Sequence, residues 1–259
     1  MRTIRTIRAR VYGKLYLGQD VDSLKYLKYT LLKMACVEYG GNIVSELAEL
    51  QKRNPEREAV GYFTVEKKDA GVLVTEYSVV AFGDDDRVAF REFREYPFHT
   101  HPVNLHGMPE PPSGEDFMQC LSWGYPEFNP DMKSSAGEVV VSSEGLWHYR
   151  ASEALVRLYF DLQRTDEQQQ NLLAKTMCRY LTAVTTIYKN SMISLEKLFD
   201  LTGTLQFGWL ETVLQKNPSF LKYLTAEFPL ESLHKLAEGA GFEDTPGFHL
   251  CFSAACALE

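Results

Sequence analysis

The sequence predicts an α+β fold, with a mainly helical region at the C-terminus. Residues 58–101 contain segments rich in Val, Thr, Tyr and Phe that are separated by turn residues, as in β-sheets. Residues 22–53 instead carry leucines at three- and four-residue steps, which indicates helices. The helical spacing returns from Ala151 onward. We therefore divide the chain into a domain at residues 1–150 and a mainly helical region at residues 151–259.

The first segment of the chain has two interpretations. Residues 1–19 contain five basic side chains and no acidic one, a composition typical of organelle targeting segments. The serine enrichment of such segments is missing, however, and Ile7, Ala9 and Val11 alternate as they would on one face of a strand. We favour a strand over residues 6–17.

Local signals place the remaining elements in order. A helix over residues 22–39 ends at two consecutive glycines, because glycine readily adopts the backbone conformation that terminates helices. A second helix over residues 43–53 ends before an Asn-Pro pair, since the residue before a proline disfavours helical geometry. Strands are predicted at residues 58–65, 71–82 and 87–101, a hairpin at 138–142 and 146–150, and helices between residues 155 and 184 and at about 205–215, 219–227 and 230–238.

Two histidines and an aspartate in the middle of the chain form a candidate metal site. His99 and His101 stand one residue apart in a predicted strand, so their side chains point to the same side. Pro102 ends that strand because it has no N–H to offer. After a loop, Ser113 is a predicted helix N-cap, and Asp116 follows on the first turn, where it can face the histidines. Two imidazoles and one carboxylate, with a fourth position left for water, is how catalytic zinc is held.

Together these residues resemble the JAMM signature of the MPN (JAB-type) zinc metalloprotease family. The family adds a glutamate at the start of an earlier strand, typically in a Glu-x-x-Gly context, and Glu58-Ala59-Val60-Gly61 fits that pattern. The resemblance covers roughly residues 40–150. It departs from the family at the loop of eleven residues, 102–112, which is longer than usual. Insertions in loops are tolerated at small entropic cost, so the identities of the ligands stand.

The resemblance implies an MPN-like α/β/α fold, in which helices flank a mixed sheet, and a role for each residue of the motif. The zinc ligands would be His99, His101 and Asp116. Glu58 would act as general base on the water that the zinc activates, and Ser113 would help to hold the tetrahedral intermediate. Glu56 is a rival for the general base, but the spacing to Gly61 favours Glu58.

The implied activity is zinc-dependent hydrolysis of an amide bond, often the isopeptide or peptide bond at the tail of a ubiquitin-like protein. The alternative is an MPN-fold scaffold or interaction subunit of a larger complex, without hydrolase activity. Scaffold members usually lack one or more ligands, whereas this sequence has all three, with Glu58 and Ser113. A zinc deaminase would need a His-x-Glu motif and paired cysteines, and neither pattern occurs.

Each motif also has a plainer explanation. A lone His-x-His pair is common on exposed strands, and a Ser-x-x-Asp start is found in many ordinary helices. It is their conjunction in one chain order, with a proline after His101, that favours a catalytic site. His249 and Cys251 also stand two residues apart, but no third ligand follows at a recognisable spacing, so we assign them to an apolar C-terminal segment.

Charge, hydropathy and cysteine usage narrow the classes of partner and compartment. The formal net charge of −8 argues against nucleic-acid binding, which would need a basic face. No apolar run approaches the length of about 20 residues that a membrane span needs. Five scattered cysteines suit reduced thiols in the cytoplasm. We therefore expect a cytoplasmic protein with a protein or peptide substrate, whose C-terminal helices are available for a protein partner or for self-association.

Overall fold

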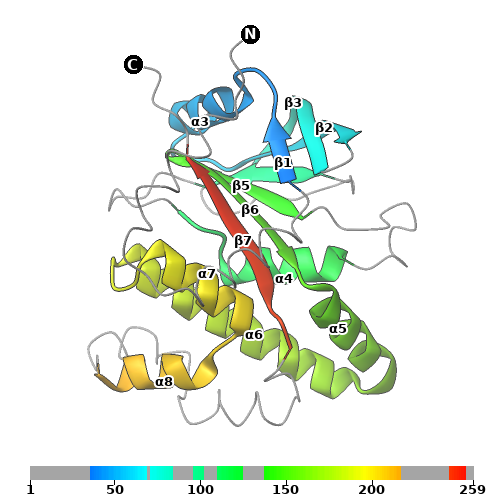
Figure 1. Cartoon of the computed structure of the whole chain (residues 1–259), viewed down its shortest axis with the longest axis vertical. Helices are drawn as coiled ribbons and strands as arrows, with labels where there is room; N and C mark the ends of the chain where they lie inside the picture. The colour runs from blue at the N-terminus through cyan, green and yellow to red at the C-terminus, as the bar shows by residue number, and fades with distance from the viewer. Residues whose placement is uncertain are drawn as a thin grey trace. The chain divides into compact units, whose positions relative to one another are not determined.

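A computed structural model describes residues 36–68, 71–83, 96–101, 110–124, 137–216 and 245–254. All of them belong to one structural unit, Cys36–Glu259. They form seven strands in a single mixed sheet and six helices (Figure 1). The predicted strand at residues 6–17, most of the predicted helix at 22–39 and the predicted helices at 219–227 and 230–238 lie outside the described residues.

The sheet has the strand order β1-β3-β2-β4-β5-β6-β7. Its strands are β1 (Cys36–Tyr39), β2 (Ala59–Lys68), β3 (Gly71–Phe82), β4 (Pro97–Thr100), β5 (Glu138–Ser142), β6 (Gly145–Ala151) and β7 (Phe248–Ala254). The pairs β1–β3 and β4–β5 are parallel, and the other neighbours are antiparallel. The sheet is therefore mixed, and the short strand β4 lies at its centre between β2 and β5.

Helices cover both faces of this sheet. They are α3 (Ile43–Arg53), α4 (Gly114–Trp123), α5 (Glu153–Thr165), α6 (Glu167–Lys189), α7 (Leu195–Thr204) and α8 (Phe207–Lys216). Alternation along β5 separates two cores, because Val139 and Val141 pack in the cluster of α3 while Val140 packs in that of α4, α6 and α7. Figure 1 shows α3 apart from the other helices, with the strands between them.

The C-terminal helices bury their apolar stripes inside the chain. Leu173, Met177, Tyr180 and Val184 of α6 are all buried, in the same core as Trp147 of β6. The helical region thus packs directly on the sheet. No helix in the described part of the chain combines the length and the apolar character needed to cross a membrane.

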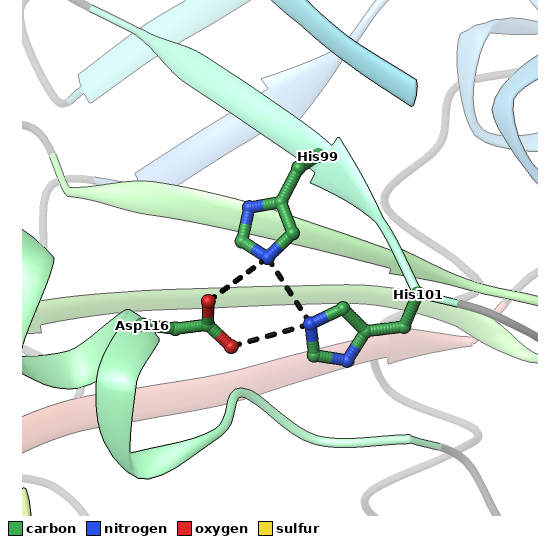
Figure 2. Close-up of side chains that lie close together, drawn as sticks. All are labelled: His99, His101 and Asp116. Carbon is green, nitrogen blue, oxygen red and sulfur yellow. Dashed lines mark hydrogen bonds and ion pairs between the residues drawn. The ribbon is translucent and has the colours of Figure 1, made fainter. Parts of the chain in front are cut away.

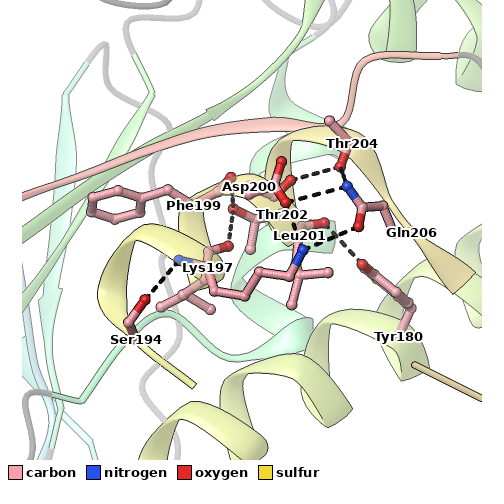
Figure 3. Close-up of polar contacts among 10 residues, drawn as sticks. Tyr180, Ser194, Lys197, Phe199, Asp200, Leu201, Thr202, Thr204 and Gln206 are labelled. Atoms are coloured by element: carbon pink, nitrogen blue, oxygen red, sulfur yellow. Dashed lines mark hydrogen bonds and ion pairs between the residues drawn. The ribbon is translucent and has the colours of Figure 1, made fainter. Parts of the chain in front are cut away.

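A polar cluster marks the junction between α7 and α8 (Figure 3). Leu205 has a left-handed backbone (φ 49°), which ends α7. Gln206 then turns back: its amide nitrogen donates to Thr204 Oγ1 at 2.8 Å, and its amide oxygen accepts from Lys197 Nζ at 3.2 Å. The Tyr180 hydroxyl of α6 donates to a backbone carbonyl of α7 at 3.0 Å. These contacts lie where α7 ends and α8 starts. The helix predicted at about 205–215 therefore begins at Phe207.

Several predicted elements are confirmed, one is wrong, and one strand was not predicted. Helix 43–53 and the hairpin at 138–150 form where the sequence predicts them. Residues 36–39, predicted as the end of a helix, form β1 because Val37 and its neighbours pair with β3. The apolar segment with His249 and Cys251 is also a strand, β7, which pairs with β6 and completes the sheet. In both cases a partner strand distant in sequence decides the conformation.

Candidate metal centre

Strand β4 presents the two histidines on one face of the sheet. Phe98 and Thr100 point to the face of α3, and His99 and His101 to the opposite face, where α4 lies. His99 is paired in register with Val140 of β5. His99 and His101 are only 5% and 7% exposed. The plainer explanation, two solvated histidines on an exposed strand, is therefore excluded, because β4 is a central strand covered by a helix.

The start of α4 brings the carboxylate to this face. Ser113 caps the helix: its hydroxyl oxygen accepts the Asp116 N–H at 3.2 Å, and Asp116 Oδ2 accepts the Ser113 N–H at 2.6 Å. This reciprocal capping box holds the aspartate side chain at the first turn. Gly114 lets that turn approach α6, since a Cβ there would lie 2.2 Å from Thr182 Oγ1.

The three side chains converge on one another (Figure 2). The Nε2 atoms of His99 and His101 are 3.1 Å apart. Asp116 Oδ1 lies 3.1 Å from His99 Nε2, and Asp116 Oδ2 lies 3.2 Å from His101 Nε2. Within the described residues this is the one group of three or more His, Cys, Asp or Glu side chains close enough to share a metal ion.

One donor atom from each of the three side chains lies within 4.8 Å of the others, close enough to share a metal ion. Ligand atoms that each lie about 2.0–2.1 Å from zinc at tetrahedral angles are about 3.3–3.4 Å from one another. The separation of 3.1 Å between the two Nε2 atoms is near that value, whereas the Asp116 contacts of 3.1 and 3.2 Å are made by different carboxylate oxygens, Oδ1 toward His99 and Oδ2 toward His101. Two imidazole nitrogens and a carboxylate suit zinc, and they also suit iron(II), so the donor set by itself does not choose the metal.

The imidazoles and the carboxylate shift one another's pKa values. Burial by itself would lower the pKa of His99, but the adjacent Asp116 carboxylate, together with Glu58 and Glu138, raises it to about 9. Burial would raise the pKa of Asp116, whereas the imidazoles of His99 and His101 hold it well below its usual range. Because metal-binding imidazoles must be deprotonated, a metal ion would take the place of a proton here.

Glu58 lies immediately before β2, on the same face as the histidines. Val60 is in register with His99, and Glu58 precedes Val60 by two residues. Its carboxylate is half-buried and close enough to raise the pKa of His99. The backbone carbonyl of Glu58 accepts the N–H of Gly83 at 2.8 Å, which ties this residue to the end of β3. Glu56, the rival carboxylate, is exposed in the preceding turn.

Gln51, Thr100 and Gly61 support the metal site from the face of the sheet that α3 covers. Gln51 Nε2 donates to the carbonyl of His101 at 2.9 Å, and the Ala59 N–H donates to Thr100 Oγ1 at 2.8 Å. Gly61 provides space for a ring, since a Cβ there would lie 2.5 Å from the side chain of Phe98. Gln51 could have been noticed in the sequence, because it follows Leu47 by four residues on the apolar stripe of its helix. No pattern in the sequence predicts the hydrogen bond between Ala59 and Thr100.

The other candidate ligands do not form a second centre. Cys251 Sγ lies 3.9 Å from His148 Nδ1 across the β6–β7 pair, where His148 and Cys251 are in register. No third ligand joins them among the described residues. His106 of the long loop lies outside the described residues.

Comparison of the sequence with protein-family models and with curated proteins finds no match. The evidence for the class of this protein is therefore the site itself and its setting, the elements of the fold that carry it. That setting is a central strand with His-x-His, a helix that begins with Ser-x-x-Asp, and a glutamate at the start of the neighbouring strand.

Proposed function

We propose that this chain is a zinc-dependent hydrolase of amide bonds, with an MPN-like fold and a JAMM-type site. The observation that carries the proposal is the buried cluster of His99, His101 and Asp116, in which one donor atom from each side chain lies within 4.8 Å of the others. The half-buried carboxylate of Glu58 on the same face supplies the group that hydrolysis needs besides the metal.

Each residue would act at a defined atom. Bound zinc would polarise the scissile carbonyl and lower the pKa of water to about 7. The Glu58 carboxylate would accept the proton of the attacking water and return it to the leaving amine. The Ser113 oxygen accepts the Asp116 N–H, so the hydroxyl proton stays available as a donor to the developing oxyanion.

The substrate class rests on the resemblance of the motif alone. We expect a protein or peptide substrate, cleaved at an isopeptide or peptide bond at the tail of a ubiquitin-like protein. The alternative is a scaffold subunit that keeps the fold without the activity. The presence of all three ligands together with Glu58 and Ser113 favours the enzyme.

Metal content and a carboxylate-to-amide exchange test the proposal together. The purified chain should contain one zinc ion, and His101→Ala should lose it, as measured by elemental analysis. Glu58→Gln should keep the zinc and lower the cleavage rate of a ubiquitin-like fusion or chain by about 10²–10⁴-fold or more, because the general base is lost. Glu56→Gln, two residues away and exposed, is the matched control and should remain active.

The outcomes separate the hypotheses. Absence of metal, or full retention of metal after both histidines are replaced, would refute the metal centre. Iron in place of zinc would keep the centre and overturn the choice of zinc. Bound zinc without cleavage of any ubiquitin-like substrate would favour the scaffold alternative, and full activity in both glutamine variants would exclude a carboxylate base at this position.

A further inference from the structure

Glu138, the first residue of β5, is a buried carboxylate that the proposed mechanism does not use. It is 3% exposed. The Tyr149 hydroxyl donates to its Oε2 at 3.1 Å, whereas its Oε1 is buried and has no hydrogen-bond partner among the described residues. A buried carboxylate oxygen without a partner is destabilising, and such a group usually has a functional reason.

The strand register places Glu138 beside the metal centre. His99 is paired with Val140 of the parallel strand β5, and Glu138 precedes Val140 by two residues. Glu138 therefore points to the same face as His99, one strand away. Tyr149 is paired with Glu138 across the antiparallel β5–β6 pair and shares that face. The carboxylate and its hydroxyl donor thus lie on the site's own side of the sheet.

Electrostatics connect Glu138 with two of the ligands. Burial raises the pKa of Glu138 to about 8, the His99 imidazole opposes this rise, and the Asp116 carboxylate adds to it. In turn, Glu138 contributes to the raised pKa of His99. A dication bound by these ligands would favour the ionised form of Glu138, since a nearby opposite charge stabilises a carboxylate.

We propose that Glu138 is a positioning residue of the metal centre, whose buried carboxylate beside His99 offsets the charge of the metal and keeps the metal at this end of the site, and that the Tyr149 hydroxyl holds this carboxylate in place. The inference rests on the metal centre of the proposed function. Carboxylates in the outer shell of a metal-binding imidazole tune the metal centre, and loss of such an outer-shell group typically weakens metal binding about 10–100-fold.

A purely structural role is the competing explanation, in which Glu138 only connects β5 to β6 through Tyr149. Glu138→Gln distinguishes the two roles. Glutamine has nearly the same shape, and its amide oxygen can still accept from the Tyr149 hydroxyl, so the structural link remains while the negative charge is lost.

The experiment measures Zn²⁺ affinity by competition with a chelator, and the absorption spectrum of the Co²⁺-substituted site, on the full chain. We expect Glu138→Gln to weaken Zn²⁺ binding about 10–100-fold and to change the Co²⁺ spectrum. Tyr149→Phe, which leaves the carboxylate but removes its donor, should weaken binding by a smaller factor. Tyr180→Phe is the matched control: it also removes a buried tyrosine hydrogen bond, at 3.0 Å to Leu201 O, but in the α6–α7 packing (Figure 3).

The control should melt at a lower temperature and bind Zn²⁺ as the wild type does. Wild-type affinity and spectrum in Glu138→Gln would overturn the inference and leave the metal centre intact. A wild-type chain that binds no metal would overturn the proposed function itself, and this inference with it. If Glu138→Gln does not fold, Tyr149→Phe decides: unchanged affinity and spectrum in that variant count against the positioning role.

Discussion

Ionisation of Glu138 should make the metal-free protein less stable as the pH rises. The pKa of this carboxyl is raised from 4.5 to about 8, mainly by burial. Between those pH values the folded chain keeps a proton that the unfolded chain has released. The stabilisation is therefore fully present below pH 4.5 and is lost as the pH rises through 8. Each unit of pKa corresponds to about 1.4 kcal/mol, so the whole difference amounts to about 5 kcal/mol in the free energy of unfolding.

That magnitude is large compared with the total stability of about 5–15 kcal/mol that is typical of a domain. The charged and titratable groups that influence Glu138, or are influenced by it, are His99 on β4, Asp116 and Cys120 on α4, and Tyr149 on β6. Glu138→Gln leaves all of them in place. The difference in stability between wild type and variant therefore isolates the carboxyl group.

The assay is urea-induced unfolding in the presence of a chelator, from about pH 5 to about pH 9, with wild type and Glu138→Gln side by side. We expect the wild type to lose several kcal/mol relative to the variant as the pH rises, with the steepest change below pH 8. A constant difference across this range would refute the reasoning, because Glu138 would then ionise alike in the folded and unfolded chains.

Two further substitutions test how the site is supported. Gly114→Ala should destabilise the chain by about 1–3 kcal/mol in thermal melts and weaken metal binding, because the new Cβ would overlap Thr182 Oγ1 and push α4 away from α6. The control is Gly208→Ala in α8, where a Cβ meets nothing within 4 Å; this variant should be neutral or slightly stabilising in the same melts. Gln51→Leu should cost about 1–3 kcal/mol in urea unfolding, because the buried carbonyl of His101 loses its side-chain donor; unchanged stability would show that water replaces the glutamine.

The sequence contains enough information to locate the candidate ligands. Strand alternation predicts that His99 and His101 share a face, and the Ser-x-x-Asp pattern predicts a helix start with Asp116 on its first turn. Both are local effects: the first follows from the period of two along a strand, and the second from the unpaired N–H groups at a helix start. Helix 43–53 and the hairpin at 138–150 are predicted for the same reason.

Elements defined by distant partners could not be predicted in this way. The segment at Cys36–Tyr39 is a strand because β3 pairs with it, and Phe248–Ala254 is a strand because β6 does. Strand formation depends on the neighbour that satisfies the backbone, and a sequence pattern does not identify a neighbour more than 30 residues away.

The sequence by itself determined which side chains could bind a metal and on which kind of element each one lies. Only the tertiary structure decided that one donor atom from each lies within 4.8 Å of the others, that the site is buried, and that Gln51 and Glu138 support it. The physical reason is that burial and convergence arise from packing between β4, α3, α4 and β5. The position of α4 over β4 depends on contacts such as that of Gly114 with α6. The Ser-x-x-Asp motif does not specify these contacts.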